Sequence, residues 1–115
     1  MCLPCFARSS SNSYLEQIGL QLYTLRKAIA KDLSKTLEEV ASFGYRQVEP
    51  YGFPSPMSIE IIKKSKDLGM KVHSAHFTWD SLLHPGKKGM RPFAEVLETA
   101  REHELTDLVV PYLHN

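Results

Sequence analysis

The stretch Gly69–Phe77, GMKVHSAHF, decides how the rest of the chain is interpreted. A glycine that can end a helix is followed by an apolar residue, a cation, and a short strand that we predict over Lys71–Ala75. The earlier stretch Gly44–Val48, GYRQV, repeats the same order of glycine, apolar residue, cation and strand. The repeat indicates that the chain passes from helix to strand in the same way at least twice.

Extending this pattern in both directions predicts strands that alternate with helices. Strands are expected at 18–25, 45–49, 71–75 and 106–113, and helices at 32–44, 55–69 and 91–105. Asp32 or Ser34, Ser58 and Pro92 are placed to begin the three helices. Such alternation is typical of parallel βα units, either in an open doubly wound sheet or in part of a (β/α)₈ barrel. The first strand-to-helix turn contains no glycine, which argues against a dinucleotide-binding fold.

Polar and aromatic side chains gather where the predicted strands end. The first strand carries Gln21 and Tyr23, the second ends in Glu49, and the third leads into His76 and Trp79. Each residue alone has an ordinary structural explanation, such as a solvated strand end or a hydrogen-bonded histidine. In parallel α/β proteins, however, ligands bind beyond the carboxyl ends of the strands. We therefore expect these five residues to surround a substrate-binding pocket, with the loop from about 77 to 89 as a candidate lid.

The composition is that of an ordinary globular domain. The 115 residues include fourteen Lys and Arg and thirteen Asp and Glu, which leaves a net charge of +1. This balance does not favour a nucleic-acid or membrane partner, because both select a clustered basic excess. Residues 1–16 contain Cys2 and Cys5 in a C-x-x-C spacing, a possible redox or metal half-site, but they also have the composition of a disordered tail or of a truncated export signal. We expect the domain to cover 17–115 and the parent protein to be periplasmic, with a cytoplasmic location as the alternative.

Three stretches together resemble the sugar phosphate isomerase/epimerase family of xylose isomerase-like TIM barrels. They are IGLQLYTLR at 18–26, TLEEVASFGYRQVEPYG at 36–52 and GMKVHSAHF at 69–77. The resemblance is clear from Ile18 to Phe77 and looser to Leu113. It implies parallel βα units that form the first half of a TIM (β/α)₈ barrel, up to about the fourth strand.

The resemblance also implies an activity. Enzymes of this family use a divalent metal ion to move a proton next to a carbonyl of a sugar or polyol. Gln21, Tyr23, Glu49 and His76 match positions that line the substrate pocket. The metal ligands and the acid–base pair of the family come from later strands, so no catalytic residue and no metal ligand is assigned here, and Mn, Mg, Zn and Co are not distinguished.

A complete barrel needs about 250 residues. We therefore expect this chain to be an inactive fragment of a longer isomerase or epimerase, whose partner is the missing half of the barrel or a second copy. One alternative is an endonuclease of the apurinic-site type, which would need a basic face for phosphate contacts. The other is a non-catalytic α/β module, either flavodoxin-like or self-associating.

Overall fold

The computed structural model of the protein describes residues 17–113. The Cys2 and Cys5 motif and the signal-like segment therefore lie outside the described residues. Short strands alternate with helices along the chain. In chain order the elements are β1 (Gly19–Gln21), the 3₁₀ helix η1 (Leu22–Leu25), α3 (Arg26–Lys31), α4 (Leu33–Ser42), β2 (Gln47–Glu49), α5 (Pro56–Asp67), β3 (Ser74–His76), α6 (Asp80–Leu83), α7 (Phe93–Glu102) and β4 (Asp107–Val109).

The strands of the described region pair in parallel, β1 with β2 and β3 with β4. Gln21 lies opposite Glu49 in the first pair, and His76 lies opposite Val109 in the second. Two isolated parallel bridges join the β2 and β3 segments, Gln47 to Lys71 and Phe53 to Phe77. The strands therefore follow one another in the order of the sequence, which confirms the prediction of parallel βα units.

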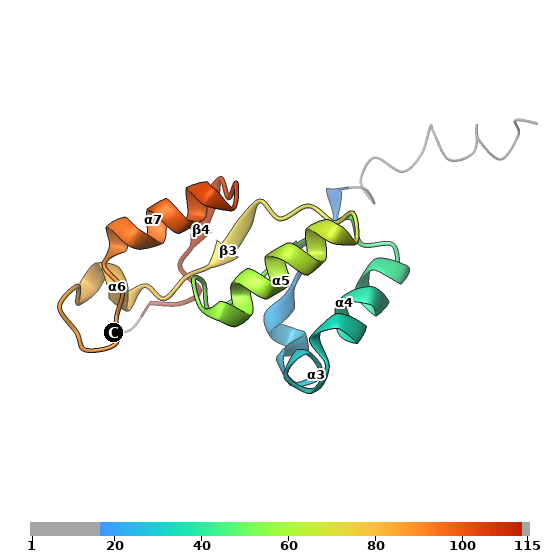
Figure 1. Cartoon of the computed structure of the whole chain (residues 1–115), viewed down its shortest axis with the longest axis horizontal. Coiled ribbons are helices and arrows are strands. Elements are labelled where there is room, and N and C mark those ends of the chain that lie inside the picture. Colours follow the sequence, from blue (N-terminus) through green and yellow to red (C-terminus); the bar gives the residue numbers. More distant parts are fainter. Residues whose placement is uncertain (1–16, 114–115) are drawn as a thin grey trace, which may run out of the picture.

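The two strand pairs, joined by the bridges between β2 and β3, form one layer that we call the sheet, and its two faces differ in polarity. Val48 and Ala75, at the centres of β2 and β3, are buried, whereas the residues on either side of each are only partly buried. Because side chains alternate along a strand, one face packs into the core and the other carries the polar residues. Figure 1 shows α5 lying between α4 and α7, and buried apolar residues from all three helices join the same core. The polar face is the side on which the site forms.

The sequence of α4 accounts for its boundaries. Asp32 is the N-cap, and its carboxylate accepts a hydrogen bond of 3.0 Å from the N–H of Lys35. Leu37 and Val40 are buried, one turn apart on the face that meets the core. The chain leaves the helix through Gly44, whose φ of 98° lies in the left-handed region that glycine adopts without strain. Asp32, rather than Ser34, is therefore the cap.

The start of α5 corrects one expectation. Ser55, not Ser58, is the N-cap, and its side chain accepts a hydrogen bond from the N–H of Ser58. Pro56 occupies the first helical position, where its fixed φ suits the helix and its missing N–H costs nothing. Ser58 lies one turn inside the helix and is fully buried, and its hydroxyl donates to the carbonyl of Ser55.

The structure also shortens the first predicted strand and adds a helix to the predicted loop. β1 ends at Gln21 because the Gln21 side chain accepts a hydrogen bond from the N–H of Tyr23 and caps η1. The loop after β3 contains the single-turn helix α6, in which the N–H of His84 donates to the carbonyl of Asp80 over 2.7 Å. Both features turn the chain at the carboxyl ends of the strands.

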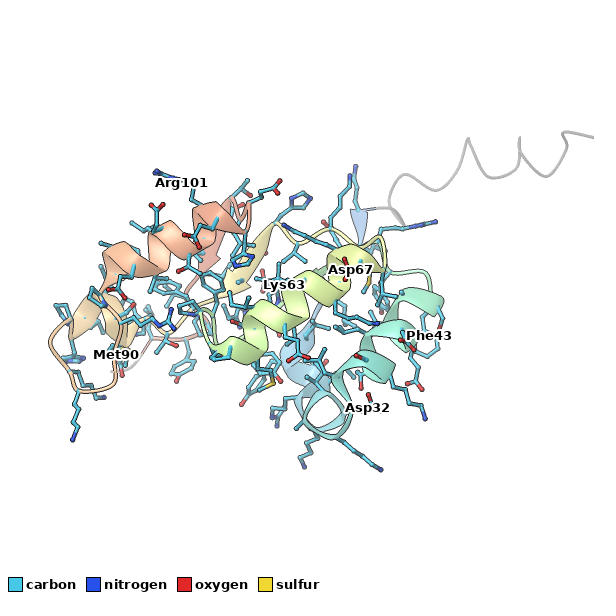
Figure 2. All side chains as sticks on the ribbon, viewed as in Figure 1. Asp32, Phe43, Lys63, Asp67, Met90 and Arg101 are labelled. Atoms are coloured by element: carbon cyan, nitrogen blue, oxygen red, sulfur yellow. The ribbon has the colours of Figure 1, made fainter. Side chains whose placement is uncertain are left out.

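The outer surface of the helices is polar. Figure 2 shows Lys63, Asp67 and Arg101 projecting outward from their helices, and all three are exposed. Within residues 17–113 no helix is both long and apolar enough to cross a membrane.

Candidate functional site

The carboxyl ends of β1, β2 and β3 bring three of the predicted residues together. Gln21, Glu49 and His76 are the last residues of these strands, and all three are partly buried. Parallel pairing places the ends of adjacent strands at one edge of the sheet. Residues that are far apart in the sequence therefore meet at this edge.

Glu49 and His76 form a direct contact between neighbouring strands. His76 Nε2 lies 3.0 Å from Glu49 Oε1, and each side chain is 23% exposed. The hydroxyl of Ser74 donates a hydrogen bond to the other carboxylate oxygen, Glu49 Oε2. A carboxylate only accepts hydrogen bonds, so Nε2 of His76 must carry the proton in this contact. In the neutral ring Nδ1 is then an acceptor, and it has no hydrogen-bond partner among residues 17–113.

The side chain of Gln21 makes hydrogen bonds to the backbone on both sides of the site. Its amide nitrogen donates to the carbonyl of Pro50 over 3.4 Å, and its amide oxygen accepts from the N–H of Tyr23. Both polar groups of the Gln21 side chain are therefore engaged within the protein. Their arrangement ties the end of β1 to the segment after β2.

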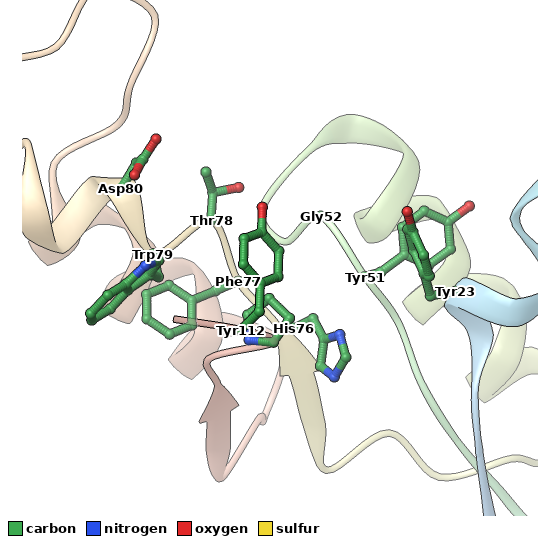
Figure 3. Close-up of a pocket in the computed structure, with 10 residues that line it drawn as sticks. Tyr23, Tyr51, Gly52, His76, Phe77, Thr78, Trp79, Asp80 and Tyr112 are labelled. Atoms are coloured by element: carbon green, nitrogen blue, oxygen red, sulfur yellow. The ribbon is translucent and has the colours of Figure 1, made fainter. Parts of the chain in front are cut away.

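A cavity of about 460 Å³ opens beside His76, and we call it the aromatic cavity. Figure 3 shows His76 between Tyr112 and the pair formed by Tyr23 and Tyr51. The residues that line the cavity come from the ends of β1 to β4 and are Tyr23, Tyr51, Gly52, His76, Phe77, Thr78, Trp79, Asp80, Pro111 and Tyr112. Aromatic walls with a few polar groups are typical of small-molecule sites.

Tyr23 and Tyr51 form one wall of the aromatic cavity. Their rings meet edge to face with centroids 5.5 Å apart, and the guanidinium of Arg26 lies 4.3 Å from the centroid of Tyr23. Arg26 also donates a 3.0 Å hydrogen bond to the carbonyl of Tyr23. Burial raises the pKa of the Tyr51 phenol, the charge of Arg26 acts against this shift, and Tyr23 adds to it. Burial therefore favours the neutral form of the Tyr51 phenol.

Trp79 and Asp80 form the opposite wall. The indole Nε1 of Trp79 is buried and has no hydrogen-bond partner among residues 17–113. Asp80 lies 3.3 Å from Lys87 and 3.7 Å from His84, so its carboxylate is held by the loop that follows α6. Figure 3 shows Trp79 beside Phe77, away from Tyr23 and Tyr51.

The predicted residues fall into two adjoining groups. Tyr23, His76 and Trp79 line the aromatic cavity, while Gln21 and Glu49 line a neighbouring hollow of about 300 Å³ on the polar face of the sheet. The contact between His76 and Glu49 joins the two spaces. The structure thus brings all five predicted residues to one end of the strands, without placing them in a single cavity. A substrate role for each of them stays a prediction.

Ser74 and Tyr112 lie at the site but are not among the five residues predicted to bind substrate. Ser74 lines the hollow and holds Glu49. It precedes His76 by two residues, and this period places both side chains on one side of the strand. Tyr112 lines the aromatic cavity from beyond β4, and its position depends on the chain packing back against β3, which a local pattern does not reveal.

The described residues do not suffice to hold a metal ion. Within 17–113 no group of three or more His, Cys, Asp or Glu side chains is close enough to bind one. Glu49 and His76 offer one oxygen and one nitrogen ligand, fewer than the three or more protein ligands that a catalytic zinc site uses.

The described fold is similar to that of a sugar phosphate isomerase/epimerase from Parabacteroides distasonis, known from a crystal structure at 1.70 Å resolution. The TM-score is 0.58 and the sequences are 26% identical. The similarity covers 85% of this chain and 39% of that protein. Neither a protein-family model nor a curated protein sequence matches the chain.

This similarity defines the class of fold. The chain has short parallel strands and helices arranged as in part of a TIM-barrel-like isomerase, which confirms the predicted fold class. The resemblance to sugar phosphate isomerases/epimerases is likewise confirmed in three dimensions. The chain spans 39% of the neighbour's length.

Proposed function

We propose that this chain forms the substrate-binding wall of a sugar isomerase or epimerase, an enzyme that moves a proton next to a carbonyl group. The observation that supports this proposal most strongly is the contact between Glu49 and His76. A carboxylate and an imidazole meet at the carboxyl ends of adjacent strands, beside an aromatic cavity, in a fold similar to that of a sugar phosphate isomerase/epimerase. Active sites of TIM barrels form at this end of the strands.

The chemistry of these groups suits a polyhydroxylated ligand. The Nδ1 atom of neutral His76 can accept a hydrogen bond from a substrate hydroxyl, and Glu49 has further lone pairs for a second one. The rings of Tyr23 and Trp79, which line the cavity, provide apolar surface for the C–H groups of a sugar ring. We infer that the ligand is a small sugar or polyol, and that neither nucleic acid nor membrane is a partner.

We propose that the residues that move the proton in the isomerase reaction are not among residues 17–113. In enzymes of the proposed class, a divalent cation polarises the substrate carbonyl when it is bound. The described residues do not form a site for such a cation. We propose that the chain alone binds substrate weakly and has no isomerase activity.

A binding experiment tests this proposal. The chain, labelled with ¹⁵N, is titrated with fructose and with inositol, and the backbone amide signals of Gln21, His76 and Trp79 are followed. We expect saturable shifts at these signals for at least one of the two compounds. Glu49→Gln should weaken binding about tenfold, because it removes a charged hydrogen-bond acceptor. The matched control is Glu38→Gln, since Glu38 forms an exposed ion pair with Lys64 on the helical side. The absence of shifts at these signals with both compounds would contradict the proposal.

A second proposal concerns the edges of the sheet. Within the described chain, β1 and β4 each pair with a single strand, and Ile18, Tyr112 and Leu113 beside them are exposed. We propose that these edges are covered in the functional protein, either by the other part of the barrel or by a second copy of the chain. Sedimentation of the isolated chain tests the second possibility, and a monomer at all concentrations would exclude self-association.

A further inference from the structure

A second cavity lies beside the aromatic cavity and differs from it in charge. It has a volume of about 220 Å³ and lies between the turn that precedes α5 and the loop 84–92. Gly52 and Thr78 line both cavities, so the two share a wall. The aromatic cavity is lined by Asp80 and by no lysine or arginine, whereas the second is lined by Arg91 and by no acidic residue. We call this second space the loop cavity.

A buried hydroxyl in the loop cavity has no partner. Ser81 lines the cavity and is only 1% exposed, and its Oγ finds no hydrogen-bond partner among residues 17–113. The backbone of Ser81 is fixed, because its N–H donates a 3.0 Å hydrogen bond to the carbonyl of Thr78. Buried polar groups in native proteins are nearly always paired. The Ser81 hydroxyl therefore points to a ligand that accepts its hydrogen bond.

The N-terminus of α5 meets the same cavity. Ser55 and Pro56, the cap and the first residue of this twelve-residue helix, line it. The first N–H groups of a helix have no acceptor within the helix, and this end carries the positive pole of the helix dipole. Pro56 has no N–H, and the side chain of Ser55 takes up the N–H of Ser58, so this helix end acts mainly through its field. The electrostatic field of the helix terminus favours a negative group in the cavity.

The loop 84–92, across the loop cavity from the start of α5, adds positive charge. Residues 84–92 contain Lys87, Lys88 and Arg91 and no acidic residue. Lys87 is paired with Asp80, but within the described part of the chain neither Lys88 nor Arg91 forms an ion pair. Arg91 is exposed at the rim of the cavity. Its planar guanidinium is suited to binding two oxygens of one anion.

We propose that the loop cavity is an oxyanion subsite, which binds a phosphate or carboxylate group through Arg91, the Ser81 hydroxyl and the N-terminus of α5. Because the loop cavity shares a wall with the aromatic cavity, the anion belongs to a substrate whose hydroxylated part lies beside His76. The assignment of the anion to a substrate rests on the proposed function, whereas the oxyanion subsite itself does not.

Titration of the ¹⁵N-labelled chain with inorganic phosphate, at constant ionic strength set with chloride, tests the subsite. The amide signals of Ser81, Gly89 and Arg91 should shift saturably. Arg91→Gln should weaken binding about tenfold, the effect of losing one charge-assisted contact, and Ser81→Ala should weaken it several-fold. Arg101→Gln is the control, because Arg101 is exposed on α7 and does not line the cavity. No saturable shift, or equal affinity in the wild type and Arg91→Gln, would overturn the subsite.

A second titration shows whether the anion is part of the substrate. A phosphate ester of fructose should bind more tightly than either fructose or phosphate alone, and Arg91→Gln should remove this gain. An ester that binds no more tightly than fructose would overturn the link between the two cavities. Phosphate binding without any fructose or inositol binding would leave the oxyanion subsite established and contradict the proposed sugar site instead, so the two failures are distinguishable.

Discussion

His76 Nε2 lies 3.0 Å from Glu49 Oε1, although the two residues belong to different strands and a helix separates them in the sequence. Glu49 is held from its other oxygen by Ser74. The contact fixes Nε2 as the nitrogen of His76 that carries the proton. In the neutral ring, Nδ1 is therefore the nitrogen that can accept a hydrogen bond from a ligand. Glu49, His76 and Ser74 thus form one connected group across β2 and β3.

Removal of the Ser74 hydroxyl tests this coupling. Ser74→Ala leaves Glu49 without one of its two hydrogen bonds and frees it to move. We expect fructose or inositol, whichever the wild type binds, to bind several-fold more weakly, with little change in the free energy of unfolding. Ser42→Ala is the control, because the Ser42 hydroxyl donates to the carbonyl of Glu39 at an exposed helix end. Equal affinities of Ser74→Ala and the wild type in a calorimetric titration would show that Ser74 does not position Glu49.

The packing of α4 on the sheet predicts a large loss of stability for a core substitution. Leu37 is completely buried, and Leu37→Ala should lower the free energy of unfolding by about 2–5 kcal/mol. Leu97→Ala removes the same atoms from a side chain that is 49% exposed, and should cost far less. Chemical denaturation followed by circular dichroism measures both values. Similar losses for the two variants would show that α4 is not packed as described.

The cap of α4 gives a separate test of the local structure. Asp32→Ala removes the acceptor of the Lys35 N–H and should lower the free energy of unfolding by about 0.5–2 kcal/mol. Asp67→Ala is the matched control, since Asp67 is exposed at the end of α5 and its loss removes an acidic group from the negative end of a helix. Thermal or chemical unfolding distinguishes the two variants. A neutral Asp32→Ala together with a destabilising Ser34→Ala would assign the cap to Ser34 instead.

The raised pKa of Tyr51 predicts how stability depends on alkaline pH. Burial favours the neutral phenol in the folded state, so the unfolded chain ionises first, at the ordinary value of 10.0. This contribution to stability is complete below that value and is lost as the pH rises through the raised pKa of the folded state. Tyr51→Phe has no ionisable group, so its free energy of unfolding should fall less between about pH 9 and pH 11 than that of the wild type. Parallel curves for the two proteins would contradict the shift.

The sequence was sufficient to predict the order of strands and helices, because the three predicted helices have regular apolar faces and the first two end at a glycine, Gly44 and Gly69. It was also sufficient to place Gln21, Glu49 and His76 at one edge, since parallel strands end at the same side of a sheet. The boundaries were less predictable. Leu22 to Leu25 are apolar enough for a strand, but the Gln21 side chain caps a 3₁₀ turn there instead.

The contacts between strands could not be predicted from local patterns. The contact between Glu49 and His76 depends on the register of β2 against β3, and this register is set by the bridges between Gln47 and Lys71 and between Phe53 and Phe77. The loop cavity likewise depends on tertiary structure, which brings Ser81 of α6 beside Ser55 and Pro56 at the start of α5. Such features follow from tertiary packing and not from residue periodicity.

The most direct test of the central claim is the ¹⁵N spectrum of the His76 ring, recorded in alkaline buffer, where a histidine ring is neutral, before and after addition of the sugar or polyol. The contact with Glu49 predicts a ring protonated at Nε2 and an Nδ1 signal that shifts when the ligand binds. A ring protonated at Nδ1 would contradict the described contact. An Nδ1 signal unchanged by saturating fructose and inositol would contradict the proposal that His76 accepts a hydrogen bond from a substrate hydroxyl.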